Sequence, residues 1–183
     1  MKSTKLLITV LALLAIGIMV GCWGTSSKSP DVSDSIRKSL DQAGLKEVTV
    51  TQDRDKGIVT LGGQVTNDND KAQAESLAKS LAGSQVVANQ IAVVPVGAGK
   101  DTSAVNSDLD QGIGSNLDAA LIQNHLHDSV KFEVKNGVVT LKGDVDSEDK
   151  RTAAENIATG VPNVHQVVNT LEVLKHRKAS SAQ

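Results

Sequence analysis

The chain has 183 residues, with 19 lysines and arginines, 21 aspartates and glutamates, one cysteine and only two aromatic residues. A single cysteine excludes an intrachain disulfide, and the lack of aromatic side chains removes the usual stacking platform for single-stranded nucleic acid. The acidic balance also argues against nucleic acid as a partner, because proteins that bind polyanions are generally basic.

The N-terminus predicts a secretory signal with lipid attachment. Two lysines in residues 1–5 precede an uncharged run over residues 6–20, which is short for a membrane-spanning helix. The stretch Met19-Val20-Gly21-Cys22 resembles a bacterial lipobox, in which the cysteine becomes the new N-terminus and is acylated. We therefore expect residues 1–21 to be a lipoprotein signal peptide and Cys22 to carry the lipid. The alternative is an ordinary signal peptide with an incidental cysteine.

The residues after the cysteine predict where the protein lies. Residues 22–30 are a polar tether that would hold the next domain near the bilayer. Trp23 is suited to contact the membrane at the level of the headgroups. In Gram-negative lipoproteins an aspartate at this place usually signals retention in the inner membrane, so Trp23 favours the periplasmic face of the outer membrane. Without Lys2 and Lys5, the chain keeps 17 basic and 21 acidic residues, a net charge of −4.

An internal repeat sets the domain organisation. Residues 57–93 align with residues 137–173 without a gap, and 12 of the 37 aligned positions are identical. Two copies are too few for a solenoid, so the repeat predicts two small globular domains in tandem. The predicted domains span residues 31–96 and 108–175, joined by a linker over residues 97–107 that is rich in small and polar residues, with a tail over residues 176–183.

Hydrophobic spacing and turn residues predict the same order of elements in both copies: helix, strand, strand, helix, strand. In the first domain these are a helix that ends at Gly44, strands at 48–51 and 58–65, a helix capped by Thr66 or Asn67, and a strand at 86–94. In the second they are a helix from about Asp108, strands at 130–134 and 138–145 around the turn Asn136-Gly137, a helix capped by Asp146 or Ser147, and a strand at 164–173.

Strand alternation predicts which face of the second strand is buried. Val59, Leu61, Gly63 and Val65 share one face, and their size predicts a core. A glycine in this row suggests close approach of another segment, and we expect the following helix to pack over Gly63, so that Gly63→Val destabilises the domain. The repeated positions expected to serve the structure are Gly57, Gly63, Asn89, Gly137, Gly143 and Asn169.

An asparagine interrupts the apolar row of the last strand in each copy, at Asn89 and Asn169. A buried amide needs hydrogen-bond partners. It could contact a ligand, or it could satisfy the backbone of a nearby loop or helix. We favour the structural interpretation, because most side-chain hydrogen bonds in proteins go to backbone or water.

Each copy resembles a BON domain (bacterial OsmY and nodulation). The resemblance rests on the Gly-x-Val-Thr-Leu-x-Gly-x-Val strand, the alanine-rich helix after it, and the closing strands at 87–93 and 167–173. It implies an α+β fold, in which each αββαβ domain has a three-stranded mixed sheet with two helices on one face. Two such domains behind a lipobox resemble dual-BON envelope lipoproteins, and without the lipid they would resemble osmotically inducible periplasmic proteins. The resemblance implies binding to membrane phospholipid and support of envelope integrity or osmotic stress tolerance.

The charges give this membrane role only local support. The first domain has nine acidic and seven basic residues, and the second domain with its tail has eleven and eight. The candidate membrane contacts besides Trp23 are Arg37, Lys38, Lys175, Arg177 and Lys178. Charged residues of this kind most often only form a solvent-exposed face of the protein. The alternative function is a periplasmic adaptor or stress protein that binds envelope proteins without touching lipid headgroups.

The sequence predicts no enzyme, no cofactor and no metal site. It has no Gly-x-Ser-x-Gly elbow and no His-Glu-x-x-His pair. His125 and His127 would diverge on a helix and have no further ligands nearby, which disfavours a metal there.

Overall fold

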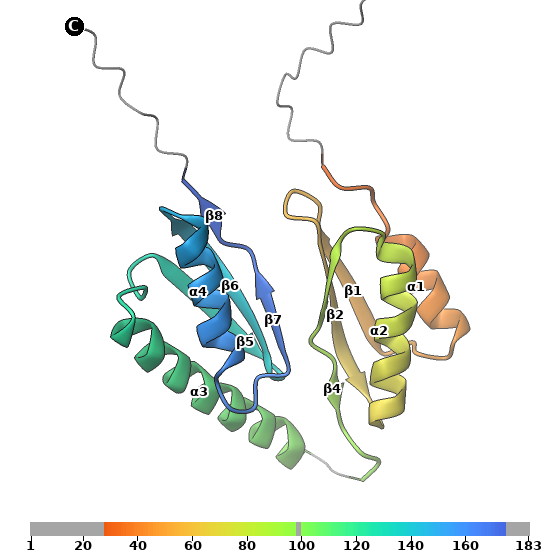
Figure 1. The fold of residues 1–183 in the computed structure, drawn as a ribbon. Coiled ribbons are helices and arrows are strands. Elements are labelled where there is room, and N and C mark those ends of the chain that lie inside the picture. Colours follow the sequence, from red (N-terminus) through yellow and green to blue (C-terminus); the bar gives the residue numbers. More distant parts are fainter. Residues whose placement is uncertain (1–27, 98–99, 175–183) are drawn as a thin grey trace, which may run out of the picture.

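The computed structural model describes residues 28–97 and 100–174. Within these residues the chain forms two α+β domains of the same αββαβ order (Figure 1). The first contains α1 (Ser33–Gln42), β1 (Val48–Asp53), β2 (Ile58–Val65), α2 (Asp68–Ala82), β3 (Val86–Asn89) and β4 (Ala92–Val93). The second contains α3 (Lys100–Gln123), β5 (Val130–Lys135), β6 (Val138–Val145), α4 (Glu148–Thr159), β7 (Gln166–Asn169) and β8 (Glu172–Val173).

Each domain has the predicted mixed sheet. β1 and β2 form an antiparallel hairpin, and β3 runs parallel to β2 on its other side, because α2 carries the chain back across the sheet. The second domain repeats this with β5, β6 and β7. The predicted turn is confirmed: Asn136 and Gly137 have φ values of 49° and 76°, as a two-residue hairpin of primed type requires. Asn67 and Ser147, both among the predicted caps, accept the backbone N–H of Asp70 and Lys150.

The core of each domain lies between the sheet and its two helices, on the face that alternation predicted. Val59 and Leu61 are fully buried, and Ala74 and Ala78 of α2 lie in the same core. These alanines let the helix approach the sheet closely, because they have no side chain beyond Cβ. The second domain repeats the arrangement with Val139, Leu141, Ala154 and Ala158.

The predicted reason for Gly63 is wrong. Gly63 has a φ of +86°, and a Cβ there would collide with the backbone carbonyl oxygen of Glu47, which precedes β1. The close approach therefore comes from the neighbouring hairpin strand and not from α2. Gly143 repeats the arrangement against the carbonyl oxygen of Ser129. Glycine is needed at both places because the backbone is left-handed there and leaves no room for a side chain.

The prediction that each domain closes with one continuous strand is also wrong. β3 ends at Asn89 and β4 begins at Ala92, and both pair with β2 in the same register. Between them the N–H of Ile91 bonds to Oδ1 of Asn89 at 3.4 Å, so it is not available to a neighbouring strand. Leu171 and Asn169 repeat this contact at 3.1 Å. A side-chain hydrogen bond thus competes with the sheet ladder.

The predicted linker over residues 97–107 is mostly helical. α3 begins at Lys100 and continues for 24 residues through the first helix of the second domain. None of residues 100–107 is glycine or proline. Each residue added to an existing helix gains a backbone hydrogen bond, so the domain's own helix extends backwards through this stretch.

The two domains pack sheet against sheet. Figure 1 shows α1 and α2 on one outer side, α3 and α4 on the other, and the two sheets between them. Each domain thus uses the sheet face that its own helices leave uncovered. The β1–β2 hairpin turn lies at one end of the molecule, and the β5–β6 turn lies at the opposite end (Figure 1).

Candidate functional site

The contact between the two sheets is built from equivalent positions of the repeat. Its apolar centre is a separate cluster of four buried residues: Ile58, Ala88, Val138 and Val168. Ile58 and Val138 are 80 residues apart, as are Ala88 and Val168, so each domain contributes the same two positions. The interface therefore has the character of a two-fold pair, made within one chain.

One glutamine side chain completes the edge of the first sheet. Gln166 Nε2 donates to the carbonyl oxygen of Val87 at 2.7 Å, and Gln166 Oε1 accepts from the N–H of Asn89 at 3.0 Å. These backbone groups belong to β3, an edge strand of its sheet. The amide thus takes the place of a neighbouring strand, and it covers an edge that would otherwise offer unpaired backbone groups. The equivalent residue of the first domain is Val86, which cannot do the same.

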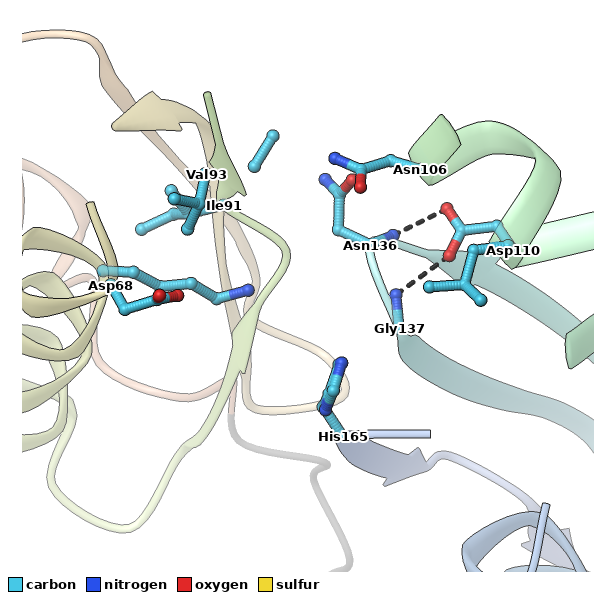
Figure 2. A pocket seen from close by; sticks show the side chains of 11 residues that line it. Asp68, Ile91, Val93, Asn106, Asp110, Asn136, Gly137 and His165 are labelled. Atoms are coloured by element: carbon cyan, nitrogen blue, oxygen red, sulfur yellow. Dashed lines mark hydrogen bonds between the residues drawn. The ribbon is translucent and has the colours of Figure 1, made fainter. Parts of the chain in front are cut away.

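The turn of the second hairpin adds another polar contact between the domains. Asn136 Nδ2 donates to the carbonyl oxygen of Gln90 at 2.7 Å. The turn is itself held by Asp110 of α3, whose carboxylate accepts the N–H groups of Asn136 at 2.7 Å and Gly137 at 2.9 Å (Figure 2). The apolar centre of the interface is thus symmetric, but these polar contacts are not. The side chains of Gln166 and Asn136 in the second domain bond to the backbone of the first domain.

Clefts open around this interface. Figure 2 shows one of them, with a volume of about 200 Å³, where Ile91 and Val93 face Asn136 and His165 across the gap. A second cleft of about 260 Å³ is its repeat equivalent, with the first hairpin turn against the second domain. A third, of about 430 Å³, lies between the open sheet faces and is lined by Asp53, Lys56, Ile58, Thr60, Ala88, Gln90, Glu133, Thr140, Lys142 and Thr170.

The charges in these clefts come from equivalent places of the two copies. Lys71 lines the first cleft and Arg151 the second. Burial lowers the pKa of the Lys71 ammonium, against the opposing effect of the Asp68 and Glu75 carboxylates. Arg151 Nη1 contacts Glu148 at 3.0 Å, while its Nε is buried without a hydrogen-bond partner. Each of these two clefts is therefore lined by one cation, Lys71 or Arg151, that is only partly exposed to water.

The third cleft carries a salt bridge on its wall. Lys142 Nζ lies 2.8 Å from Glu133 Oε2, and this hydrogen bond lowers the pKa of the Glu133 carboxyl. These clefts offer polar and charged groups for binding. Among the residues that the structure describes, no group of three or more histidine, cysteine, aspartate or glutamate side chains could hold a metal. His127 instead contacts Asp118, with Nδ1 and Oδ1 2.8 Å apart.

Each repeated asparagine makes hydrogen bonds within its own domain. Asn89 is 4% exposed, and its Nδ2 donates to the carbonyl oxygen of Lys71 and to Glu75 Oε2, at 3.3 and 2.9 Å. Asn169 makes the equivalent bonds to Arg151 and Glu155 at 3.2 and 2.9 Å. Each amide therefore ties the closing strand of its domain to the second helix.

Removing the Asn89 amide is expected to change how stability depends on pH. The pKa of Glu75 is lowered, first by the hydrogen bond from Asn89 and then by Lys79. A carboxyl whose pKa is lowered by folding stabilises the protein above its unfolded pKa, and this contribution is lost as the pH falls through the folded pKa. Asn89→Ala should therefore cost about 2 kcal/mol at neutral pH, including the loss of packing, and less in acid.

Thermal unfolding of Asn89→Ala and the unchanged protein, at about pH 7 and about pH 3, measures this difference. Lys79→Gln is the matched control: it removes the second cause of the lowered pKa at an exposed position and leaves the buried amide in place. A destabilisation of Asn89→Ala that is equal at both pH values would contradict the role assigned to the Asn89–Glu75 bond.

Most of the predicted membrane contacts lie outside the described residues. These are Trp23, Lys175, Arg177 and Lys178, and the predicted lipidation site Cys22 also lies outside the described residues. Arg37 and Lys38 are exposed on α1, and Arg37 Nη2 also donates to the carbonyl oxygen of Val50 at 3.1 Å, which gives Arg37 a structural role. No helix among residues 28–97 and 100–174 is both long and apolar enough to cross a membrane.

The sequence analysis missed the residues that join the domains. Ile58 and Val138 lie next to Val59 and Val139, so two adjacent apolar side chains point to opposite faces of the strand. Two adjacent apolar residues at this place in both copies indicate that both faces of the strand are covered, because a strand with one solvated face would alternate apolar with polar residues. Gln166 and Asn136 carry no comparable signal, since their role depends on the partner domain.

Comparisons with known proteins agree with the fold. The family model described as "BON domain" matches residues 29–95 and 108–175. The chain is 30% identical over 135 residues to "Osmotically-inducible protein Y" of Escherichia coli (strain K12), which covers 73% of this chain and 66% of that protein. The chain therefore spans slightly less than two thirds of the length of this relative.

Two solved structures of CdsD, described as a structural protein of the type III secretion system of Chlamydia trachomatis, also match. Both are 14% identical with a TM-score of 0.32, and the matches cover 78% and 77% of this chain and 67% and 63% of theirs. The family assignment rests on the family model, which covers nearly all of the described residues in two copies. The chain belongs to the BON domain family.

Proposed function

We propose that this chain is a cell-envelope protein that supports envelope integrity under osmotic stress. Two observations support this proposal. Two BON domains make up the described chain, and its sequence is similar to that of an osmotically inducible protein. The proposed anchor is a lipid on Cys22, at the periplasmic face of the outer membrane, with Trp23 at the headgroups. The proposed partners are membrane phospholipid and envelope proteins.

The proposed function is non-enzymatic. In the interdomain clefts Glu133 is paired with Lys142, and Asp110 accepts two backbone N–H groups. These contacts hold the structure together. Binding, through the lipid and the protein surface, is the activity that the residues support.

Replacing the cysteine tests the anchor. Cys22→Ser is expected to move the protein from the membrane fraction to the fraction released from the periplasm, because two or more acyl chains provide stable anchoring. Fractionation with antibody detection measures this. If the variant stays in the membrane fraction, a lipid on Cys22 is not what holds the protein there.

The same unlipidated variant separates the two functions left open by the sequence. If the BON surface contacts headgroups, Cys22→Ser protein should sediment with anionic phosphatidylglycerol vesicles at low salt and lose binding at high salt. Lys38→Gln is the informative further variant, because Lys38 is exposed on α1, whereas Arg37 also donates to the carbonyl oxygen of Val50. Absence of sedimentation at low salt favours the adaptor that binds envelope proteins.

A further inference from the structure

Two equivalent edge strands, β3 and β7, direct backbone groups away from their own sheets. Figure 1 shows β7 on the side of its sheet that is turned to the first domain. The N–H of Thr170 donates to the carbonyl oxygen of Leu141 in β6 at 2.9 Å. Backbone groups of successive residues in a strand point to alternate sides, so the N–H of Asn169 and the carbonyl of Val167 point away from the sheet.

In the first domain the equivalent outward groups are covered. They are the carbonyl of Val87 and the N–H of Asn89, and the carboxamide of Gln166 bridges them at 2.7 and 3.0 Å. Asn89 is accordingly only 4% exposed. A single amide group, which donates once and accepts once, therefore suffices to cover this stretch of sheet edge.

In the second domain the same stretch is open. Val86 stands in the place of Gln166 and has no donor or acceptor in its side chain. Among the residues that the structure describes, none bonds to the outward carbonyl of Val167 or to the N–H of Asn169. Val86 is 47% exposed, and it lines the cleft of about 260 Å³ together with Asn169, which is itself partly exposed.

The cleft beside this edge is small and has an apolar lining with charges of both signs. Its volume is below the range of about 300–1,000 Å³ that is typical of sites for drug-sized ligands, so it holds a short stretch of chain. Two acidic and two basic residues line it, which gives no preference for a charged ligand. The apolar lining residues are Ile58, Val86, Val168 and Leu171, and the charged ones are Asp55, Lys56, Arg151 and Glu172.

A peptide backbone is the occupant that matches this edge. The first domain shows that an amide fits the equivalent groups, and every peptide unit carries the same donor and acceptor. One residue of a parallel neighbouring strand would donate to Val167 and accept from Asn169, two positions later. Addition of an extended peptide to an exposed sheet edge is a recurring mode of recognition, in which the neighbouring pocket receives a side chain.

We propose that the edge of β7 is a docking site for a short extended segment of a partner protein. The segment runs parallel to β7, bonds to Val167 and Asn169, and places an apolar side chain against Val86. The inference goes beyond the proposed role in osmotic stress, and it requires neither the lipid anchor nor contact with headgroups.

Hydrogen exchange and chemical shifts of the Asn169 amide test the site in the unlipidated full-length Cys22→Ser protein. The probe is an end-capped peptide of about six alternating threonine and valine residues, long enough to form one strand. We expect a saturable shift of this amide and an exchange rate that falls by about tenfold or more at saturation. The same peptide with methylated backbone nitrogens cannot donate and should have no effect.

Val86→Gln supplies the missing carboxamide from within the chain. At this exposed position it should protect the Asn169 amide without peptide and weaken peptide binding by about tenfold or more. Val86→Thr is the matched control, because it is close to valine in size and cannot reach the edge of β7. It should bind the peptide like the unchanged protein.

The reverse change opens the equivalent edge of the first domain. Gln166→Val should remove the protection of the Asn89 amide and raise the number of peptide sites per chain from one to two. A single site in this variant would overturn the argument from equivalence.

Four results would overturn the proposal itself. They are no saturable change at Asn169, equal binding of the methylated peptide, undiminished binding by Val86→Gln, and changes confined to β1 or β5 at the other sheet edges. Protection of the Asn169 amide that rises with protein concentration in the absence of peptide would also overturn it, since the edge would then pair with a second copy of the chain.

Discussion

Replacing Gly63 with valine is expected to destabilise the first domain by about 3–5 kcal/mol, because two separate penalties add at this position. The first is backbone strain, since φ is +86° and valine is β-branched. The second is the collision of the new Cβ with the carbonyl oxygen of Glu47, a backbone atom that cannot rotate away. A domain of this size has a total stability of only about 3–10 kcal/mol.

Gly44→Val separates the two penalties. Gly44 has a φ of +84°, nearly the same as Gly63, but no heavy atom lies within 4 Å of the Cβ that would be added. We expect this control to lose only about 1–3 kcal/mol, from strain alone. Chemical denaturation of both variants measures the difference. Equal losses would show that the contact with Glu47 adds nothing, and that backbone conformation alone selects glycine at position 63.

Replacing Val138 with aspartate is expected to separate the domains without unfolding either of them. Val138 is 1% exposed and belongs to the four-residue interdomain cluster, not to the core of its own domain. An unpaired carboxylate in that cluster costs about 3 kcal/mol or more, and the chain can avoid this cost by letting water enter between the sheets. The helices and their own sheet faces stay packed.

Hydrogen exchange at the Asn89 amide reports this separation. In the paired state that N–H donates to Gln166 Oε1 of the other domain, so it is protected only while the domains are in contact. A pairing loss of about 3 kcal/mol accelerates its exchange by about 100-fold. The amides of Val59 and Leu61, inside the first domain, should be unaffected. Continued protection at Asn89 would contradict a pairing that depends on the apolar cluster.

The matched control is Ile122→Asp. Ile122 is 53% exposed on α3, so the carboxylate stays in water and neither the pairing nor the fold should change. Small-angle scattering gives a second measurement, because separated domains have a larger radius of gyration than paired ones. An equal increase for both variants would indicate general destabilisation and not loss of the interface.

Local patterns were sufficient for the elements of each domain. Alternation along residues 58–65 located a buried face, and the pair Asn136-Gly137 located a turn, because both effects act between residues that are close in sequence. The same patterns failed at places where the local structure depends on residues that are distant in the sequence. The contact of Gly63 with Glu47 depends on which strand lies beside it, and α3 extended through a stretch whose composition is typical of a linker.

The sequence by itself determined the duplicated unit, its αββαβ order and its family, and it predicts lipid attachment at Cys22. These follow from periodicity, turn residues and a short signal, which are local properties of the chain. Only the tertiary structure decided that the open sheet faces meet, that Gln166 completes the edge of β3, and that both described ends of the chain lie together. Pairing depends on the complementarity of two surfaces, and the residues that form them are about 80 positions apart. The glycine-marked strand identifies the domain, and the relative placement of the two copies determines which surfaces remain for a membrane or a partner.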